Sequence, residues 1–234
     1  MTTPTTTTLS SADATTLKAV VDFCKYFATD IVRLSSTRGT VAVDETPSIA
    51  VFVDVDYKGP ELSVNRIKTL SQRIAPDSIC KVYHNTAGTP HKLEINTKKA
   101  TVDFVLPSVS AIRRIPEKFT GGFEHTLSVS RDDLVAAVKG AVSVGATHVQ
   151  LVQRGGNLQG IAFNAGEGST YTLSPAQTTL EFAYEYAVEH LLAVDKFLNV
   201  EEVTLNITPR GQLMIEVEHR GIRARVFILH NKQR

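Results

Sequence analysis

The sequence predicts an α+β protein of two tandem, similar domains, each with two helices packed on antiparallel sheets. Three observations lead to this fold class. The segment SRDDLVAAVKGAVSVGATHVQLVQRGGNLQGIAFN, which begins at Ser130, has the same pattern as ADATTLKAVVDFCKYFATDIVRLSSTRGTVAVDE near the start of the chain. Each copy is followed by a second helical pattern and three short strand patterns. The 234 residues are sufficient for two such domains.

Individual residues match between the two copies. Leu134 follows Leu17 by 117 residues, which is half the chain length. The same interval relates four further pairs of residues: Val21 and Val138, Val32 and Val149, Leu34 and Leu151, and Gly39 and Gly156. In the later part of each half the interval drifts between 122 and 124, so that only the pattern matches. We therefore expect a unit of one helix and several antiparallel strands to occur about four times.

The first expected helix begins within the opening LSSADATTLKAVVDF. Apolar residues recur at helical spacing from Leu17 to Phe27, and Lys18, Asp22 and Lys25 lie on the opposite side. A hairpin of two strands should come next. In the second copy, RGGN between two apolar runs predicts the tight turn of this hairpin.

The second expected helix is LSVNRIKTLSQRI, with Ser63 as its N-cap. Four residues form its apolar stripe: Val64, Ile67, Leu70 and Ile74. Three basic residues lie outside the stripe: Arg66, Lys68 and Arg73. This helix therefore combines a buried face with a basic, solvated face.

Three strands should follow in each half. In the first half they are SICKVYH, HKLEIN and ATVDFVL, and in the second half they are EEVTLNI, QLMIEVE and IRARVFIL. Turns that contain glycine or asparagine separate them, as is typical of antiparallel hairpins. Apolar residues alternate with polar ones, as in VTLNI, so one face of each sheet should pack against the helices.

The second half should begin with a helix that Ser130 caps, because Asp132 and Asp133 stand in its first turn, where the helix dipole favours acids. Its second helix is YAVEHLLAVDKFL. Between the halves, PSVSAIRRIPEKFTGG has two prolines, a Gly-Gly pair and no periodic pattern, which indicates a linker. We expect an N-terminal domain at residues 1–106, a connector at 107–122 and a C-terminal domain at 123–234.

The composition is that of a globular protein with little net charge. Hydrophobic residues make up 42% of the chain, and 25 basic against 24 acidic side chains give a net charge of +1. A broadly basic surface for nucleic acid is therefore not expected, although a local basic stripe is compatible with this balance. The absence of tryptophan weakens any aromatic platform for single-stranded nucleic acid.

The two cysteines and the hydropathy pattern indicate a cytoplasmic protein. Cys24 falls on the apolar face of the first helix and Cys80 falls within a strand, so we expect buried, reduced thiols. The N-terminal MTTPTTTTLSS lacks the features of a signal peptide. The longest apolar run, IAVFVDV, is too short to cross a bilayer.

No arrangement of residues predicts catalysis or a metal site. The seven histidines are scattered, and two cysteines are too few for a zinc site. Neither a nucleophile elbow nor a Walker A loop is present. The Gly-rich segments QRGGNLQG and NAGEGS do not join a strand to a helix, so they predict hairpin turns and not phosphate cradles. We expect a protein that is not an enzyme and that needs no cofactor.

The tandem domains of helices, hairpins and antiparallel strands, joined by one extended linker, resemble the DNA sliding clamps, which are the processivity rings of DNA polymerases. The resemblance extends from Leu9 to Leu229. It is closest to two-domain clamps, and the length and the opening LSSADATTLKAVVDF look more like clamps of tailed bacteriophages than like proliferating cell nuclear antigen. The resemblance implies a DNA-clamp fold and a closed homotrimeric ring around double-stranded DNA.

The same resemblance implies a role and partners. The ring would act in DNA replication, in the host cytoplasm if the protein is viral. It would tether the DNA polymerase for processive synthesis, and an ATP-dependent clamp loader would open it. Helices would line the hole of the ring and sheets would form its rim.

Basic residues on the four helices would then contact DNA phosphates without reading the base sequence. The candidate residues on these inner helix faces are Lys18, Lys25, Arg66, Lys68, Arg73, Arg131, Lys139, His190 and Lys196. The alternative is that each is an ordinary solvated residue of a helix face. The fourth helix balances Lys196 with Glu189 and Asp195, so we expect it to contribute little.

The resemblance also implies a groove for the peptide tail of a polymerase and a subunit interface. The groove would use apolar residues of the connector and of the last strand: Val109, Ile112, Ile115 and Leu229. The alternative is that these residues pin the connector to its own domains. Ring closure would pair the edge strands TVDFVL and STYTLS, through Thr101, Asp103, Val105, Ser169, Tyr171 and Leu173.

Two other classes of protein stay open. One is a non-enzymatic structural or interaction protein of duplicated α+β domains, such as a virion component, which would need no basic helix faces. The other is an enzyme with a dispersed active site, which a point change that abolishes turnover would reveal. Salt-dependent retention on circular DNA that is lost when the DNA is linearised would distinguish a clamp from the structural protein.

Overall fold

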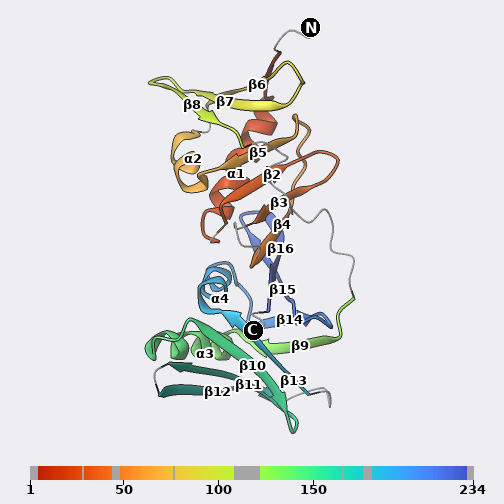
Figure 1. Cartoon of the computed structure of the whole chain (residues 1–234), viewed down its shortest axis with the longest axis vertical. Coiled ribbons are helices and arrows are strands. Elements are labelled where there is room, and N and C mark those ends of the chain that lie inside the picture. Colours follow the sequence, from red (N-terminus) through yellow and green to blue (C-terminus); the bar gives the residue numbers. More distant parts are fainter. Residues whose placement is uncertain are drawn as a thin grey trace. The chain divides into compact units, whose positions relative to one another are not determined.

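The computed structural model describes residues 5–27, 29–43, 48–75, 77–107, 122–164, 166–175 and 181–230. The chain divides into two compact units, Met1–Lys118 (unit 1) and Phe119–Arg234 (unit 2). In the described part of each unit, the elements follow one order: a strand, a helix and three strands, and then the same five elements again (Figure 1). The predicted α+β fold of two similar halves is therefore confirmed.

Unit 1 contains two such repeats. The first consists of β1 (Thr6–Thr8), α1 (Ser11–Cys24), β2 (Ile31–Leu34), β3 (Thr40–Val43) and β4 (Ile49–Asp54). The second consists of β5 (Leu62–Asn65), α2 (Ile67–Arg73), β6 (Ile79–His84), β7 (Pro90–Asn96) and β8 (Thr101–Val105). The strands are ordered β1-β6-β7-β8 in one sheet and β5-β2-β3-β4 in the other.

Unit 2 has the same arrangement. Its first repeat consists of β9 (His125–Ser130), α3 (Arg131–Ser143), β10 (His148–Arg154), β11 (Asn157–Asn164) and β12 (Glu167–Pro175). Its second consists of β13 (Phe182–Ala187), α4 (Val188–Asp195), β14 (Glu202–Ile207), β15 (Leu213–His219) and β16 (Ile222–Ile228). The strand orders are β9-β14-β15-β16 and β13-β10-β11-β12.

The two repeats of each unit exchange their first strands. In unit 1, β1 pairs with β6 of the second repeat, and β5 pairs with β2 of the first. In unit 2, β9 pairs with β14 and β13 pairs with β10 in the same way. All of these pairings are antiparallel. Each sheet therefore contains strands from both repeats, and neither repeat can complete a sheet alone.

Serine side chains begin the long helices α1 and α3. The Oγ of Ser10 accepts a hydrogen bond from the backbone N–H of Asp13 at 3.0 Å, a cap that is not among those predicted from the sequence. The Oγ of Ser130 accepts from the backbone N–H of Asp133 at 3.4 Å and caps α3, as the sequence predicts. The Asp13 carboxylate also accepts hydrogen bonds from two backbone N–H groups between β4 and β5. Burial raises the pKa of Asp13, but the hydrogen bonds from Ser10 and from these two N–H groups lower it by more. The pKa of Asp13 is therefore below its usual value.

The helix α2 begins later than the sequence predicts. Ser63 and Val64 belong to β5 and pair with β2, so the prediction that Ser63 caps the helix is wrong. Both side chains are buried, and pairing with β2 outweighs the helical spacing of the local sequence. Arg66 takes a left-handed backbone conformation with φ of 52° at the junction, and the helix starts at Ile67.

The helices contribute rows of buried apolar side chains to each core. In unit 1, α1 buries four residues completely: Leu17, Val20, Val21 and Cys24. In unit 2, α3 buries Leu134, Ala137, Val138 and Ala141. The four residues of α1 are positions that the helical spacing of the sequence indicates, and the internal repeat matches Leu134 and Val138 of α3 to Leu17 and Val21.

Cys24 and Cys80 are free thiols in the core, as the sequence predicts. Burial raises the pKa of both thiols, that of Cys80 to about 11. Both therefore stay protonated at neutral pH, and neither has the thiolate character that a reactive cysteine needs.

A network of polar side chains joins the three neighbouring strands β6, β7 and β8 on the outer face of their sheet. Glu94 accepts hydrogen bonds from Tyr83 at 2.8 Å and from Asn96 at 2.7 Å, and Lys81 lies 3.4 Å away. Lys92 connects Glu94, at 3.7 Å, to Asp103 of β8, at 3.4 Å. The hydrogen bonds from Asn96 and Tyr83 lead the causes that lower the pKa of Glu94 to about 2.

This network predicts a defined loss of stability in acid. Because the pKa of Glu94 is lower in the folded protein than its usual value of 4.5, its contribution is complete above about pH 4.5 and disappears as the pH falls toward 2. The variant Glu94→Gln should therefore unfold at lower urea concentration than the wild type at pH 7, with a difference that shrinks below pH 4. Urea unfolding at several pH values tests this, and a difference that does not change with pH would contradict it.

Candidate nucleic-acid interface

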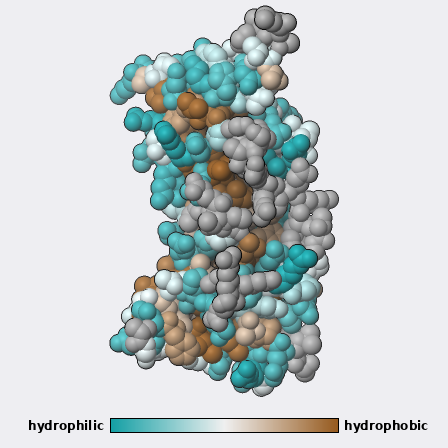
Figure 2. Space-filling view, in the orientation of Figure 1, coloured by the Kyte–Doolittle hydropathy of each residue, from teal (hydrophilic) through white to brown (hydrophobic). Residues whose placement is uncertain are grey.

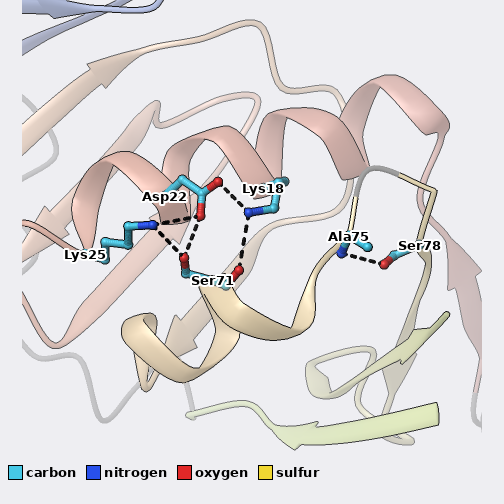
Figure 3. A network of polar contacts seen from close by, with 6 residues as sticks. All are labelled: Lys18, Asp22, Lys25, Ser71, Ala75 and Ser78. Atoms are coloured by element: carbon cyan, nitrogen blue, oxygen red, sulfur yellow. Dashed lines mark hydrogen bonds and ion pairs between the residues drawn. The ribbon is translucent and has the colours of Figure 1, made fainter. Parts of the chain in front are cut away.

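The two helices of unit 1 are joined by a polar cluster around Asp22 (Figure 3). The ammonium group of Lys18 donates to the Asp22 carboxylate and, at 3.3 Å, to the backbone oxygen of Ser71 in α2. Lys25, which follows α1 two turns beyond Lys18, lies 3.5 Å from the same carboxylate and 3.3 Å from Ser71 Oγ. Ser71 Oγ itself donates to Asp22 at 2.5 Å. One carboxylate therefore holds two lysines and ties α1 to α2.

The surroundings of Asp22 keep it ionised at neutral pH. Partial burial raises the pKa of this carboxyl, but hydrogen bonds from Lys18 and Ser71 and the charges of Lys18 and Lys25 lower it by more. Lys18 and Lys25 are therefore paired with a negative charge within the protein. They are not the freely solvated residues that the sequence indicates.

The remaining basic candidates of unit 1 are arranged differently. Arg66 precedes α2, Lys68 lies in its first turn and Arg73 in its last turn, and all three are exposed. Within the described residues we find no ion pair for their side chains. These three residues give the α2 end of the helix pair a net positive surface that is open to an anionic ligand.

An ion pair also joins the two helices of unit 2. Arg131 at the start of α3 lies 2.8 Å from Asp195 at the end of α4, through Nη2 and Oδ1. Asp195 also borders a small hollow between the helices, whose other walls are apolar residues such as Leu134 and Leu191. Lys139 of α3 and Lys196, which follows α4, are exposed. Both helix pairs thus combine a carboxylate-bound base with exposed ones.

The prediction that His190 contacts DNA is wrong. His190 is only 2% exposed, because it lies on the buried side of α4 with Leu191, Ala193 and Val194. Its imidazole cannot reach a ligand on the exposed face of that helix. The sequence carries the signal for this, because His190 stands three and four residues before two buried apolar positions.

The ion pairs of Asp22 and Asp195 differ from what the sequence indicates. The sequence places Asp22 on the polar side of the first helix and favours Asp195 as an acid that balances Lys196. The spacing of Asp22 from Lys18 and Lys25, by four and three residues, is a signal that local pairing is favoured. The contacts with Ser71 and Arg131 join segments far apart in the sequence, and no local pattern predicts them.

The two strands that the sequence indicates for ring closure lie at sheet edges within their units. β8 is the outer strand beside β7, and β12 is the outer strand beside β11. On β8 the side chains of Thr101, Asp103 and Val105 are exposed, and that of Val105 is 80% exposed. An edge strand of this kind leaves backbone N–H and C=O groups available for another strand.

Of the three side chains that the sequence predicts for a subunit contact on the edge strand β12, only that of Tyr171 is exposed. The side chain of Leu173 is only 1% exposed and packs inside unit 2, while the pairing of its strand with another subunit stays a prediction. Tyr171 is 38% exposed and packs on Gly140 of α3 so closely that a Cβ atom there would lie 2.2 Å from its ring. Ser169 is partly exposed. Figure 2 shows hydrophobic surface in the lower part of the view, where Figure 1 places α3 and β12.

The candidate peptide groove lies mostly outside the described residues, since Val109, Ile112 and Ile115 belong to the part of the connector that the structure does not describe. Leu229 is 37% exposed directly after β16. The following residue, His230, accepts a hydrogen bond from the backbone N–H of Glu185 at 3.0 Å and packs edge-on against Tyr184. These contacts hold the segment after β16 against β13.

Two further observations concern the whole described structure. The described residues contain no cluster of three or more histidine, cysteine or acidic side chains suited to a metal ion. Among the same residues, no helix has the length and apolar character needed to cross a membrane.

The fold is similar to that of known proteins, although the sequence gives no match. No protein-family model and no curated protein sequence matches the chain. Solved structures do match. A chain of the PCNA2–PCNA3 complex from Sulfolobus tokodaii is 12% identical with a TM-score of 0.57, and the match covers 98% of this chain and 100% of that one.

Two other sliding clamps match in the same way. A chain in the structure of the C-terminal region of FEN-1 bound to A. fulgidus PCNA is 13% identical with a TM-score of 0.57, covering 98% of this chain and 99% of that one. Proliferating Cellular Nuclear Antigen from Entamoeba histolytica is 14% identical with a TM-score of 0.54, covering 97% and 98%. This chain therefore has the fold of the DNA sliding clamps, as its sequence pattern indicates.

Proposed function

We propose that this chain is the subunit of a ring-shaped sliding clamp that encircles double-stranded DNA and tethers a DNA polymerase for processive synthesis. The observation that carries the proposal is the clamp fold over almost the whole chain, with two copies of the same helix–sheet unit. A sliding clamp needs no catalytic residue for this function, because a closed ring stays on DNA by encircling it.

The basic residues of the helices suit a ring that slides. Four basic residues have long, exposed side chains: Arg66, Lys68, Arg73 and Lys139. Such side chains attract phosphates through a term that does not depend on base sequence and that weakens with salt. They contribute affinity without reading bases, so the ring can move along the duplex.

We propose that three subunits close the ring, with β8 of one subunit pairing with β12 of the next. Both strands are sheet edges within their units, and antiparallel pairing would satisfy their outer backbone groups. The exposed Val105 on one edge and the exposed Tyr171 on the other are apolar residues that such a contact would bury. Because the two edges differ, the contact is head-to-tail, as a closed ring requires.

The partners would be the replicative polymerase, which binds through a peptide tail, and an ATP-dependent loader that opens the ring. The tail would occupy a groove formed by Val109, Ile112 and Ile115 of the connector and by Leu229. A. fulgidus PCNA, which matches this fold, binds the C-terminal region of FEN-1. In this chain the exposed Leu229 beside the anchored His230 offers one apolar wall for such a tail.

Charge reversal on α2 tests DNA binding. The triple variant Arg66→Glu, Lys68→Glu and Arg73→Glu should bind a labelled duplex much more weakly than the wild type, with a salt dependence reduced by about 0.9 in log–log slope for each lost phosphate contact. These side chains are exposed, so the thermal unfolding midpoint should change little. Fluorescence anisotropy over a salt titration measures the effect.

A control reverses three exposed lysines of unit 1 that lie in loops and not on α2: Lys58, Lys98 and Lys99. The control has the same change in net charge and should retain most of the DNA affinity. Equal loss of affinity in both variants, or no loss in the α2 variant, would contradict the proposed role of the helix face.

A polar substitution on the β8 edge tests ring closure. Val105→Asp places a charge in the contact that would bury Val105, so it should weaken trimer formation by about tenfold or more. Sedimentation over a wide concentration range should show the wild type at three times its 25.5 kDa chain mass and the variant as smaller species.

The control for this experiment is Ile79→Asp on β6. Ile79 is also exposed on a strand, at 55%, but β6 lies between β1 and β7 and is not an edge. This control should keep the wild-type mass. A wild-type monomer at every concentration would contradict the ring and leave only the fold.

A further inference from the structure

In each helix pair, one acidic residue forms ion pairs with neighbouring basic side chains. In unit 1 the acid is Asp22 of α1, and in unit 2 it is Asp195 of α4. The two acids do not correspond in the internal repeat, because the residue 117 positions after Asp22 is Lys139. The two units therefore reach the same arrangement, a carboxylate that bridges a helix pair, with different residues.

The held bases remain within reach of a ligand. The side chains of Lys18, Asp22 and Lys25 are 24%, 36% and 31% exposed, and those of Arg131 and Asp195 are 35% and 27% exposed. None of these groups is deeply buried, so their ion pairs can exchange with an outside anion. A phosphate oxygen and a carboxylate oxygen compete for the same donors of lysine and arginine.

We propose that Asp22 and Asp195 are internal counter-ions that compete with DNA phosphates for Lys18, Lys25 and Arg131 and so weaken the hold of the protein on the duplex. This inference rests on the proposed clamp function and adds a regulation of its DNA-binding face. The exposed Arg66, Lys68, Arg73 and Lys139 provide the standing attraction. The three held bases contribute only to the extent that they leave their carboxylates.

The physical reason is the balance of ion pairs. A solvated lysine that meets a phosphate forms a new ion pair and releases a counter-ion from the DNA. A lysine already paired with a carboxylate must give up that pair first, so little is gained. The acids thus limit both the affinity for the duplex and its dependence on salt.

The test is the isosteric variant Asp22→Asn, measured by anisotropy with a labelled linear duplex at 50 and 200 mM salt. Asparagine keeps the size of the side chain and an oxygen that accepts from Ser71, but it removes the negative charge that pairs with Lys18 and Lys25 and leaves them only their contacts with Ser71. We expect tighter binding and a steeper salt dependence. Each added phosphate contact should raise the affinity by about three- to fourfold more at 50 mM than at 200 mM salt.

Two further variants make the result specific. Asp195→Asn removes the acid of the other unit and should show the same kind of gain through Arg131. In a Lys18→Gln and Lys25→Gln background, Asp22→Asn should give no gain. A gain that persists without these lysines would overturn the inference.

The matched control is Glu218→Gln. Glu218 is paired with Arg223 at 2.9 Å on an exposed sheet face of unit 2, so the variant has the same charge change at an ion pair away from the helices. An equal gain in this control would assign the effect to net charge and overturn the inference.

The outcomes separate the two proposals. If the wild type binds the duplex and the α2 charge reversal removes binding, but Asp22→Asn and Asp195→Asn behave as the wild type, the counter-ion role fails and the clamp stands. If the wild type neither binds duplex DNA in a salt-dependent way nor is retained on circular DNA, the clamp proposal itself fails, and the counter-ion role fails with it.

Discussion

Both units depend on one constraint, the exchange of first strands between the two repeats. β1 and β5 each complete the sheet of the other repeat, and β9 and β13 do the same in unit 2. In one repeat alone, the sheet beside the helix would lack a strand, and the first strand of the repeat would have no strand to pair with. The helix α1 contacts β2 of its own repeat and α2 and β6 of the second repeat, so its buried face is covered by both. The positions of the helices, and of the basic residues on them, therefore depend on how the strands pair.

Polar contacts then fix each helix against its partner. In unit 1 the Asp22 carboxylate connects α1 with Ser71 of α2, and in unit 2 the pair of Arg131 and Asp195 connects α3 with α4. These contacts lie at the partly exposed side of the helix pairs, above the apolar core. The same charges thus serve the packing of the helices and the electrostatic character of the surface that they present.

The sequence predicts much of this structure wherever local patterns decide it. Helical spacing identifies α1 with its buried residues, and the internal repeat predicts the matching helix α3. Ser130 caps α3 as expected, and RGGN forms the turn between β10 and β11. The failures arise where distant residues decide. Ser63 enters a strand because β2 lies beside it, and His190 is buried although a basic role was expected. The partners of Lys18 and Arg131 include residues 53 and 64 positions away, beyond any local pattern.

The strand exchange also has a consequence for how the chain acquires its structure during synthesis. Thr6 of β1 pairs with Tyr83 of β6, so the first strand has no partner until most of unit 1 has left the ribosome. Contacts between residues so far apart in sequence slow the folding of a domain. We expect unit 1 to reach its native state late and all at once, after β6, β7 and β8 emerge. Nascent chains that end before Ile79 should remain sensitive to proteolysis throughout their length.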